Sequence, residues 1–315
     1  MPTSTEAPGR HGRTIRHIVA TAVHERLVGT DTPGGITPIP EGPAFDRDGK
    51  VFFISAFPDA DGYKVFRWDP QTNAIERIIA DDSIALASLV LHRDGRIFLA
   101  DFRGGSHGGG RIAVANADGS NLRTFIGEFE GTAIIPDDLI FAADGTMYYN
   151  DFQGTALNPT GRVIRVDPDG SQSLLIGGVA MPNGIGLSVK QDRLWISEHV
   201  TNRLLGIQLD GRAVPDTRVY GYFTGGLLDS ITIDSADNVY QAVYDGARVE
   251  VLDGEANPLA VITPGENPLR DYPRTTHVAI QPGGTLGVLL AGGPTGIGLF
   301  TFEALAPGLI PFSHQ

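Results

Sequence analysis

The 315-residue sequence contains no cysteine, which excludes disulfide bonds, a thiol nucleophile and a cysteine zinc site. Basic residues are also scarce: 24 Lys and Arg stand against 37 Asp and Glu, and the formal net charge is −13. Such a chain repels phosphate backbones, and it has no basic stretch interleaved with aromatic residues. We therefore do not expect nucleic acid as a partner.

Long apolar runs are missing as well. Residues 1–25 carry Arg or His every few positions, whereas a secretory signal needs about 7–15 apolar residues in a row. The longest stretch without Asp, Glu, Lys or Arg, residues 275–302, is interrupted by seven glycines and two prolines. That stretch predicts strands and turns rather than a membrane helix. We expect a cytoplasmic protein that makes no membrane contact.

Glycine and proline are abundant, with 41 and 21 residues, which indicates a folded chain rich in turns. One sequence motif recurs about every 47 residues. It consists of a turn, usually Asp-Gly, followed by a run of residues that is apolar or alternates between apolar and polar. Its copies begin at Asp48, Asp94, Asp144, Asp192 and Asp237, with a weaker sixth copy at Gly284. Asp-Gly supplies the positive-φ positions of a tight hairpin, and the run after it has β-strand character.

Further hairpin signals between these copies give about four strands per repeat. Four-stranded units repeated around an axis predict an all-β fold, a six-bladed β-propeller with a central metal-binding channel. We expect one domain over residues 1–315, in which residues 1–15 could be disordered. Residues 16–27 have strand character and could add a strand to the last blade and close the ring. The alternative is a seventh, degenerate blade.

Polar residues share one register in these repeats. The first strand of each propeller blade lines the channel, so equivalent positions face one another around the axis. Eight residues before each turn, at intervals of 46–50 residues, stand Glu41, Ala87, Asp137, Asn183, Asp229 and His277. Four of the six offer carboxylate or amide oxygens at the start of an apolar strand, where a carboxylate needs compensation.

A divalent cation would supply that compensation. Glu41, Asp137 and Asp229 pointing at one axis would repel one another and raise each other's pKa unless a cation lay among them. Oxygen donors, with the Asn183 amide among them and Ser230 nearby, suit Ca²⁺ better than zinc or copper; Mg²⁺ ranks second. Each acid alone could be an ordinary strand-start or hairpin residue, but the shared register favours a metal site.

At these residues the sequence resembles the family of senescence marker protein, gluconolactonases and luciferin-regenerating enzymes. The resemblance covers nearly the whole chain from Glu41 onward and is nearest to the drug-responsive, calcium-dependent lactonase branch. It rests on four motifs, EGPAFDRDG, IPDDLIF, PNGIGLS and LDSITID, which begin at residues 41, 135, 182 and 228. The resemblance implies a six-bladed propeller hydrolase with one catalytic divalent cation in the channel.

Carried over residue by residue, the resemblance implies metal ligands at Glu41, Asp137, Asn183 and Asp229, with Ser230 close to the ion. It also implies that Asp229 is the catalytic carboxylate and that His277 is a pocket histidine near the channel mouth. Asp138, next to the implied ligand, would then point away from the ion.

Two positions depart from the family pattern. The lactonase branch often carries a second, structural calcium near Ser106 and Gly108, but its acidic position corresponds here to Phe129, so we do not predict that ion. Leu228 stands where relatives tend to have proline, which affects the loop that shapes the substrate site.

The resulting prediction is a calcium-dependent lactonase whose substrate is a small cyclic ester. The cation would polarise the carbonyl, while Asp229 activates water or attacks directly. The alternatives are the same metal propeller acting on phosphotriesters or another ring-containing metabolite, and a non-catalytic interaction propeller. Aromatic residues near the mouth would either form an apolar wall for the substrate or pack within the blades: Phe57, Phe102, Phe152 and Tyr244.

Overall fold

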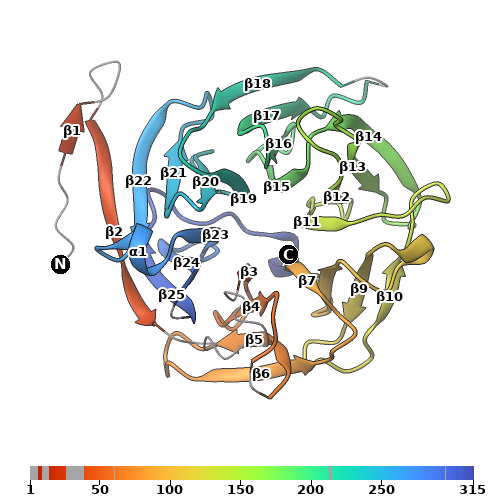
Figure 1. Ribbon diagram of the computed structural model, residues 1–315, viewed down its shortest axis with the longest axis horizontal. Helices are drawn as coiled ribbons and strands as arrows, with labels where there is room; N and C mark the ends of the chain where they lie inside the picture. Colours follow the sequence, from red (N-terminus) through yellow and green to blue (C-terminus); the bar gives the residue numbers. More distant parts are fainter. Residues whose placement is uncertain (1–5, 9–13, 26–38, 60, 213–214, 295) are drawn as a thin grey trace.

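The structure, a computed structural model, describes residues 6–8, 14–25, 39–59, 61–212, 215–294 and 296–315. In these residues the chain is almost entirely β-strand, in a propeller-like arrangement around a central axis (Figure 1). The α-helix of this part of the chain, α1 (Pro268–Asp271), has four residues, and short 3₁₀ turns lie at Ser106–Gly108 and Phe312–His314. No helix among the described residues is long and apolar enough to cross a membrane.

Four sheets have four strands each, which follow one another in the chain from the axis outward. The first consists of β3 (Pro40–Phe45), β4 (Val51–Ser55), β5 (Tyr63–Trp68) and β6 (Ile75–Ala80). The second consists of β7 (Leu86–Leu91), β8 (Ile97–Asp101), β9 (Arg111–Ala115) and β10 (Arg123–Ile126). The third consists of β11 (Pro136–Phe141), β12 (Met147–Asp151), β13 (Gly161–Val166) and β14 (Gln172–Val179). The fourth consists of β15 (Pro182–Leu187), β16 (Arg193–Glu198), β17 (Arg203–Gln208) and β18 (Thr217–Tyr222).

The remaining strands form one nine-stranded sheet. One half contains β19 (Leu227–Ile233), β20 (Val239–Tyr244), β21 (Arg248–Leu252) and β22 (Pro258–Pro264). The other half contains β23 (Arg274–Ile280), β24 (Leu286–Gly293), β25 (Gly296–Glu303) and β2 (Thr14–His24), with β1 (Glu6–Pro8) paired to β2.

The sheet count differs from the six separate blades predicted, because β2 joins the last two repeats. The first half of β2 pairs in parallel with β22, from Arg16–Ala260 to Ala20–Pro264, and its second half pairs antiparallel with β25, from Thr21–Thr301 to His24–Leu299. The predicted strand over residues 16–27 is described only as far as residue 25. Of residues 1–15, expected to be disordered, residues 1–5 and 9–13 lie outside the described ranges, and the others belong to β1 and β2.

The innermost strands nevertheless form a closed ring. Each contacts the next around the axis, in the order β3, β7, β11, β15, β19, β23 and back to β3. This ring brings the first residues of strands that lie up to about 240 positions apart in the sequence to one end of the central channel.

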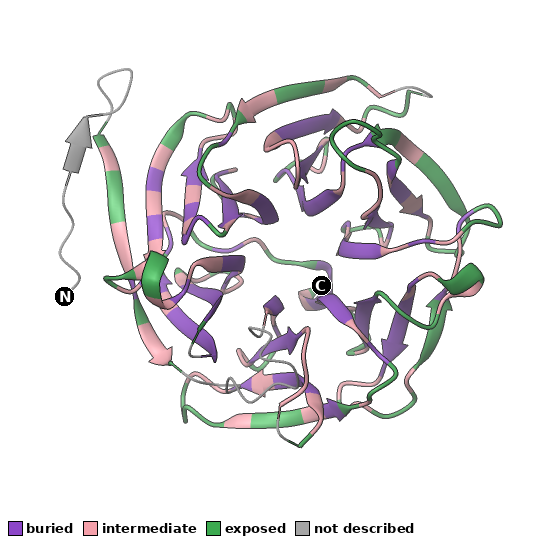
Figure 2. Ribbon diagram, viewed as in Figure 1, coloured by how far each residue is buried: buried purple, intermediate pink, exposed green. Residues whose placement is uncertain are grey.

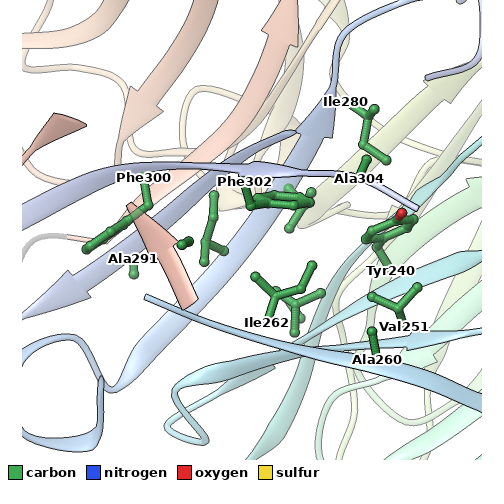
Figure 3. Close-up of a cluster of buried hydrophobic side chains, with 14 of the residues drawn as sticks. Tyr240, Val251, Ala260, Ile262, Ile280, Ala291, Phe300, Phe302 and Ala304 are labelled. Carbon is green, nitrogen blue, oxygen red and sulfur yellow. The ribbon is translucent and has the colours of Figure 1, made fainter. Parts of the chain in front are cut away.

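Apolar packing between neighbouring sheets holds this ring together, and the buried strands surround the axis in Figure 2. The cluster in Figure 3 joins the two halves of the nine-stranded sheet: Tyr240, Val251 and Ile262 from one half meet Phe300 and Phe302 from the other. Each large side chain removed from water in this way contributes about 1.5–3 kcal/mol. The alternating apolar runs of the repeat therefore face neighbouring sheets on both sides.

The first five recurring turns share one backbone hydrogen bond, from the N–H of the turn residue to the carbonyl three residues before it. In the first copy the Asp46 carboxylate accepts hydrogen bonds from the backbone N–H groups of Asp48 and Lys50, and Gly49 has a φ of +77°. Where the repeat lacks glycine, Gln191 and Asp237 adopt the left-handed conformation instead, with φ of 56° and 63°. Only one residue of each turn therefore needs positive φ, and it is not the aspartate of Asp-Gly.

Candidate metal centre and channel

The predicted ligands lie where the innermost strands are irregular. In β3, β11, β15 and β19 the pairing with the second strand shifts over two intervening residues, which are 42–43, 137–138, 183–184 and 229–230. A β-bulge releases backbone groups from the ladder and redirects side chains. It allows neighbouring polar residues, such as Asp137 and Asp138, both to be buried near the axis instead of alternating between two faces.

The acids of the ring lie in one buried, negatively charged region. Burial raises the pKa of Glu41 well above its ordinary value, and the charges of Asp229, Asp138 and Asp137 raise it further. Burial and the charges of Asp137 and Asp138 raise the pKa of Asp229 in the same way, while the Asn183 side chain partly offsets that rise. The structure thus brings together the residues that the shared register selected.

Several polar atoms of this region lack a hydrogen-bond partner among the described residues. They include Glu41 Oε2, Asn183 Oδ1, Asp138 Oδ2 and His277 Nδ1. His277 Nδ1 and Glu41 Oε2 lie 3.6 Å apart, too far for a good hydrogen bond. Because most buried polar atoms are satisfied in folded proteins, a cluster of unsatisfied oxygens beside unneutralised carboxylates indicates a place for a cation.

The donor chemistry of this ring fits a hard divalent cation such as Ca²⁺. All the predicted donors are oxygens, and they combine negative carboxylates with a neutral amide, as calcium sites do. Among the described residues, no group of three or more His, Cys, Asp or Glu side chains is already arranged as a metal cluster. Binding of an ion would therefore require the acid side chains to rearrange.

A second layer of polar side chains, which sequence reasoning missed, supports the backbone of this ring. Ser197 accepts a hydrogen bond from Gly184 N (2.7 Å) and donates one to Asp229 O (2.7 Å). Gln241 Nε2 also donates to Asp229 O, at 2.8 Å. Asn150 Nδ2 donates to the carbonyl oxygens of Asn183 and Gly184. These fully buried residues satisfy the backbone groups that the bulges release.

Asp138, which we expect to point away from the ion, is buried beside the acids of the ring. It is 3% exposed, and its charge raises the pKa of both Glu41 and Asp229. Burial raises the pKa of Asp138 itself, while His277 and hydrogen bonds from Ser88 and Ser230 counteract this rise. Asp138 and His277 both line a cavity on the inner side of the ring.

An aromatic rim runs along the opposite, mouth side. Phe102 and Phe152 stack with ring centroids 6.4 Å apart, Phe152 lies 5.6 Å from the His199 ring, and His199 lies 6.0 Å from Tyr244. The guanidinium of Arg274 lies 5.6 Å from the centre of the Tyr244 ring. Three of the four predicted aromatic residues thus form one row, which includes His199.

Neither Phe57 nor His277 belongs to this row of ring contacts. Phe57 accepts a hydrogen bond at its backbone oxygen from Ser55 Oγ. The histidine of the rim is His199, which donates from Nδ1 to Leu228 O at 2.8 Å. That bond ties the rim to the residue that precedes Asp229, where the sequence departs from the family pattern.

A cationic side chain packs on Phe129, the residue at which no acidic ligand for a second ion was predicted. The Arg162 guanidinium lies 5.3 Å from the centre of the buried Phe129 ring, and its Nη1 donates to Thr132 Oγ1 at 2.9 Å. The Thr132 hydroxyl in turn donates to Phe129 O. Position 129 therefore contributes an apolar contact and a backbone carbonyl instead of a carboxylate.

Residues 39–268 match the model of the SMP-30/Gluconolactonase/LRE-like region. The chain is 33% identical over 289 residues to a protein named Lactonase drp35 from Staphylococcus aureus (strain USA300), with 87% of this chain and 86% of that protein covered. Among solved structures, a gluconolactonase from Xanthomonas campestris has a TM-score of 0.70 at 17% identity, covering 96% of this chain and 94% of that one. A calcium-binding regucalcin from Agrobacterium tumefaciens has a TM-score of 0.70 at 15% identity, covering 93% and 98%.

Proposed function

The chain belongs to the SMP-30/gluconolactonase/LRE-like family, and from this premise we propose that it is a calcium-dependent hydrolase of cyclic esters. The observation that carries the proposal is the buried ring of acids at the start of the innermost strands. Relatives that match most of the chain are named lactonases. A ring of carboxylates without a counter-charge would be costly to bury, and a divalent cation removes that cost.

We assign the ion to Glu41, Asp137, Asn183 and Asp229, with Ser230 beside it. Each lies at or next to a bulge, and each is less than 10% exposed. For the fold we propose six blades, with the nine-stranded sheet counted as two four-stranded blades that β2 joins. The closed ring of six innermost strands supports that count.

When bound, the ion would polarise the carbonyl of the cyclic ester and stabilise the oxyanion that forms. Asp229 would accept the proton of the water that attacks the carbonyl carbon, and would return it to the ring oxygen as the C–O bond breaks. His277, whose Nδ1 lies 3.6 Å from Glu41 Oε2, is the pocket histidine that we assign beside that ligand. The aromatic rim would bind the apolar part of the substrate and exclude water from the mouth.

Hydrolysis of a simple aromatic lactone, measured before and after chelation and after calcium is restored, tests this proposal. We expect chelation to abolish turnover and calcium to restore it, and Asp229→Asn to lose at least about 10²-fold in kcat while it remains folded. Asp137→Asn should lose calcium, whereas Asp138→Asn should retain it, because the register selects the first aspartate of the pair. An active, calcium-loaded Asp229→Asn would overturn the assignment of the base.

If calcium binds but lactones are not hydrolysed, the same variants should be assayed with phosphotriesters. Turnover of phosphotriesters alone would replace the lactonase proposal and leave the metal assignment intact. If neither calcium nor turnover is found, the chain would be an interaction propeller.

A further inference from the structure

A cavity of about 290 Å³ lies in the channel on the inner side of the ring. Asp138 and His277 line it where the innermost strands begin, and Ile310 and Phe312 of the C-terminal segment line it where those strands end. The proposed ligands Glu41, Asp137, Asn183 and Asp229 are not among its lining residues. The cavity therefore adjoins the metal centre through Asp138 and His277, but neither the proposed ligands nor the residues of the aromatic rim line it.

One layer of residues surrounds the cavity. Three residues after the register positions in the six innermost strands stand Ala44, Val90, Ile140, Gly186, Thr232 and Ile280, and all six line the cavity. A Cβ at position 186 would lie only 2.9 Å from Ile231 Cγ2, so packing between neighbouring strands favours glycine there. The side chains of this layer leave space along the axis, whereas the register positions at the start of the same strands carry polar side chains.

The C-terminal segment forms the floor of the cavity and is firmly anchored. Phe312 is 3% exposed and contacts the rings of Phe141 and His92 at centroid distances of 5.4 and 4.9 Å. His314 Nε2 donates to Asp46 O at 3.0 Å. Ile310, in contrast, is 54% exposed at the edge of the cavity. A ligand would enter past Ile310 without displacing Phe312.

The lining selects against anionic ligands. Most lining residues are aliphatic or aromatic, and the described lining residues include no Lys or Arg. Asp138 is the acid among them, so an anion would enter an apolar space with no positive partner and a carboxyl at its end. Burial of an unpaired ionised carboxylate is strongly unfavourable. The hydroxy acid released from a lactone is such an anion, so the product would be excluded.

We infer that this cavity is a binding site for a small uncharged apolar molecule, with one or two rings or a short alkyl chain and one hydrogen-bonding group. Its volume is at the lower end of the range of small-molecule sites, about 300–1,000 Å³, and its lining has the typical mixture of apolar walls and a few polar groups. Asp138, His277 and Thr232 supply polar groups for a hydroxyl. The inference is independent of the proposed hydrolysis.

Two probes of similar size but different charge test the inference. 1-Naphthol is neutral at pH 7, and 1-naphthoate is an anion. Equilibrium dialysis with the full chain in saturating calcium should show saturable binding of 1-naphthol. Binding of 1-naphthoate should be at least about tenfold weaker, because its charge has no partner. Asp229→Asn should bind 1-naphthol as the wild type does, which separates this site from the metal centre.

Two cavity-filling variants locate the bound probe. Val90→Phe changes β7, a strand without a proposed metal ligand, and Ala44→Leu fills the space from β3; each should weaken 1-naphthol binding at least about tenfold. Val219→Phe, at a half-exposed site on the outer strand β18, is the matched control and should bind within about twofold of the wild type. Absence of saturable binding, equal affinity for both probes, or unchanged binding in both folded filling variants would overturn the inference.

Discussion

Replacing Asp229 by asparagine should stabilise the calcium-free protein while abolishing its stabilisation by calcium. The substitution keeps the shape of a 4%-exposed side chain and removes one of the charges that raise the pKa of Glu41. Removing a buried charge without a counter-charge is worth about 1–3 kcal/mol. For a chain of this size, that corresponds to a rise of roughly 2–10 °C in Tm.

Calcium should reverse the order of stability of the wild type and Asp229→Asn. At a concentration 1,000 times the Kd, a ligand that binds only the folded state stabilises it by about 4.1 kcal/mol, which exceeds the gain expected for Asp229→Asn. The wild type should gain that amount, and Asp229→Asn should gain little, because one carboxylate ligand is missing. In calcium the wild type therefore becomes the more stable of the two proteins.

Thermal unfolding at pH 7.5, in chelator and in excess calcium, measures both effects. The matched control is Asp151→Asn, since Asp151 is also buried but pairs with Arg162 at 2.6 Å and accepts a hydrogen bond from Ile135 N at 2.8 Å. Removal of one partner from a buried pair costs about 3–5 kcal/mol, in calcium and in chelator alike. The reasoning is refuted if Asp229→Asn is as destabilised in chelator as Asp151→Asn, or if calcium stabilises it as much as the wild type.

Three further outcomes follow from the same structure. Without calcium, burial and mutual repulsion raise the pKa values of Glu41, Asp137 and Asp229, so the folded state holds protons that the unfolded state has released. Stability should therefore fall as pH rises above the ordinary carboxyl pKa range of about 4, and calcium should remove that slope in denaturant titrations. Ser197→Ala should weaken calcium binding about tenfold in calorimetry, with partial recovery in Ser197→Thr, whereas an unchanged Kd would show that the Ser197 bonds to Gly184 N and Asp229 O do not position the ring. Phe312→Ala should cost about 3–5 kcal/mol of unfolding free energy in urea, and a loss below about 1 kcal/mol would mean that the C-terminal segment is not part of the core.

The repeat made the innermost strands and the acidic ring predictable from the sequence. The polar residue always precedes the same turn by eight positions, so Glu41 and Asp229 could be aligned although they lie 188 residues apart. In the structure Glu41 is buried, and the charge of Asp229 raises its pKa, which indicates that the two residues lie in one region. The register selects Asp137 and leaves Asp138 pointing away from the ion, which stays a prediction; both residues are buried, and the bulge at residues 137–138 removes the simple alternation between two faces.

The fused sheet and the supporting residues could not be predicted from the repeat. The parallel pairing of β2 with β22 joins segments about 240 residues apart and has no local signature. Asn150 and Ser197 stand at equivalent positions, one residue before the strand-ending acids Asp151 and Glu198, but they differ in residue type and Gln241 does not share that position. Their role depends on backbone groups that only the bulges expose. Two sheets also carry equivalent ion pairs between their second and third strands, Asp151–Arg162 and Glu198–Arg203. The loops between the two residues of each pair differ in length, so the sequence spacing does not reveal that the pairs are equivalent.

Calorimetric titration of chelator-treated protein with calcium tests the central claim most directly. We predict one calcium ion per chain, with release of protons that increases at lower pH because the raised pKa values leave ring carboxyls protonated before the ion binds. Asp229→Asn and Asn183→Leu should lose this binding while they remain folded, and Asp151→Asn should retain it if folded. No calcium binding by the wild type, or binding that both ring variants preserve, would contradict a metal centre at the start of the innermost strands.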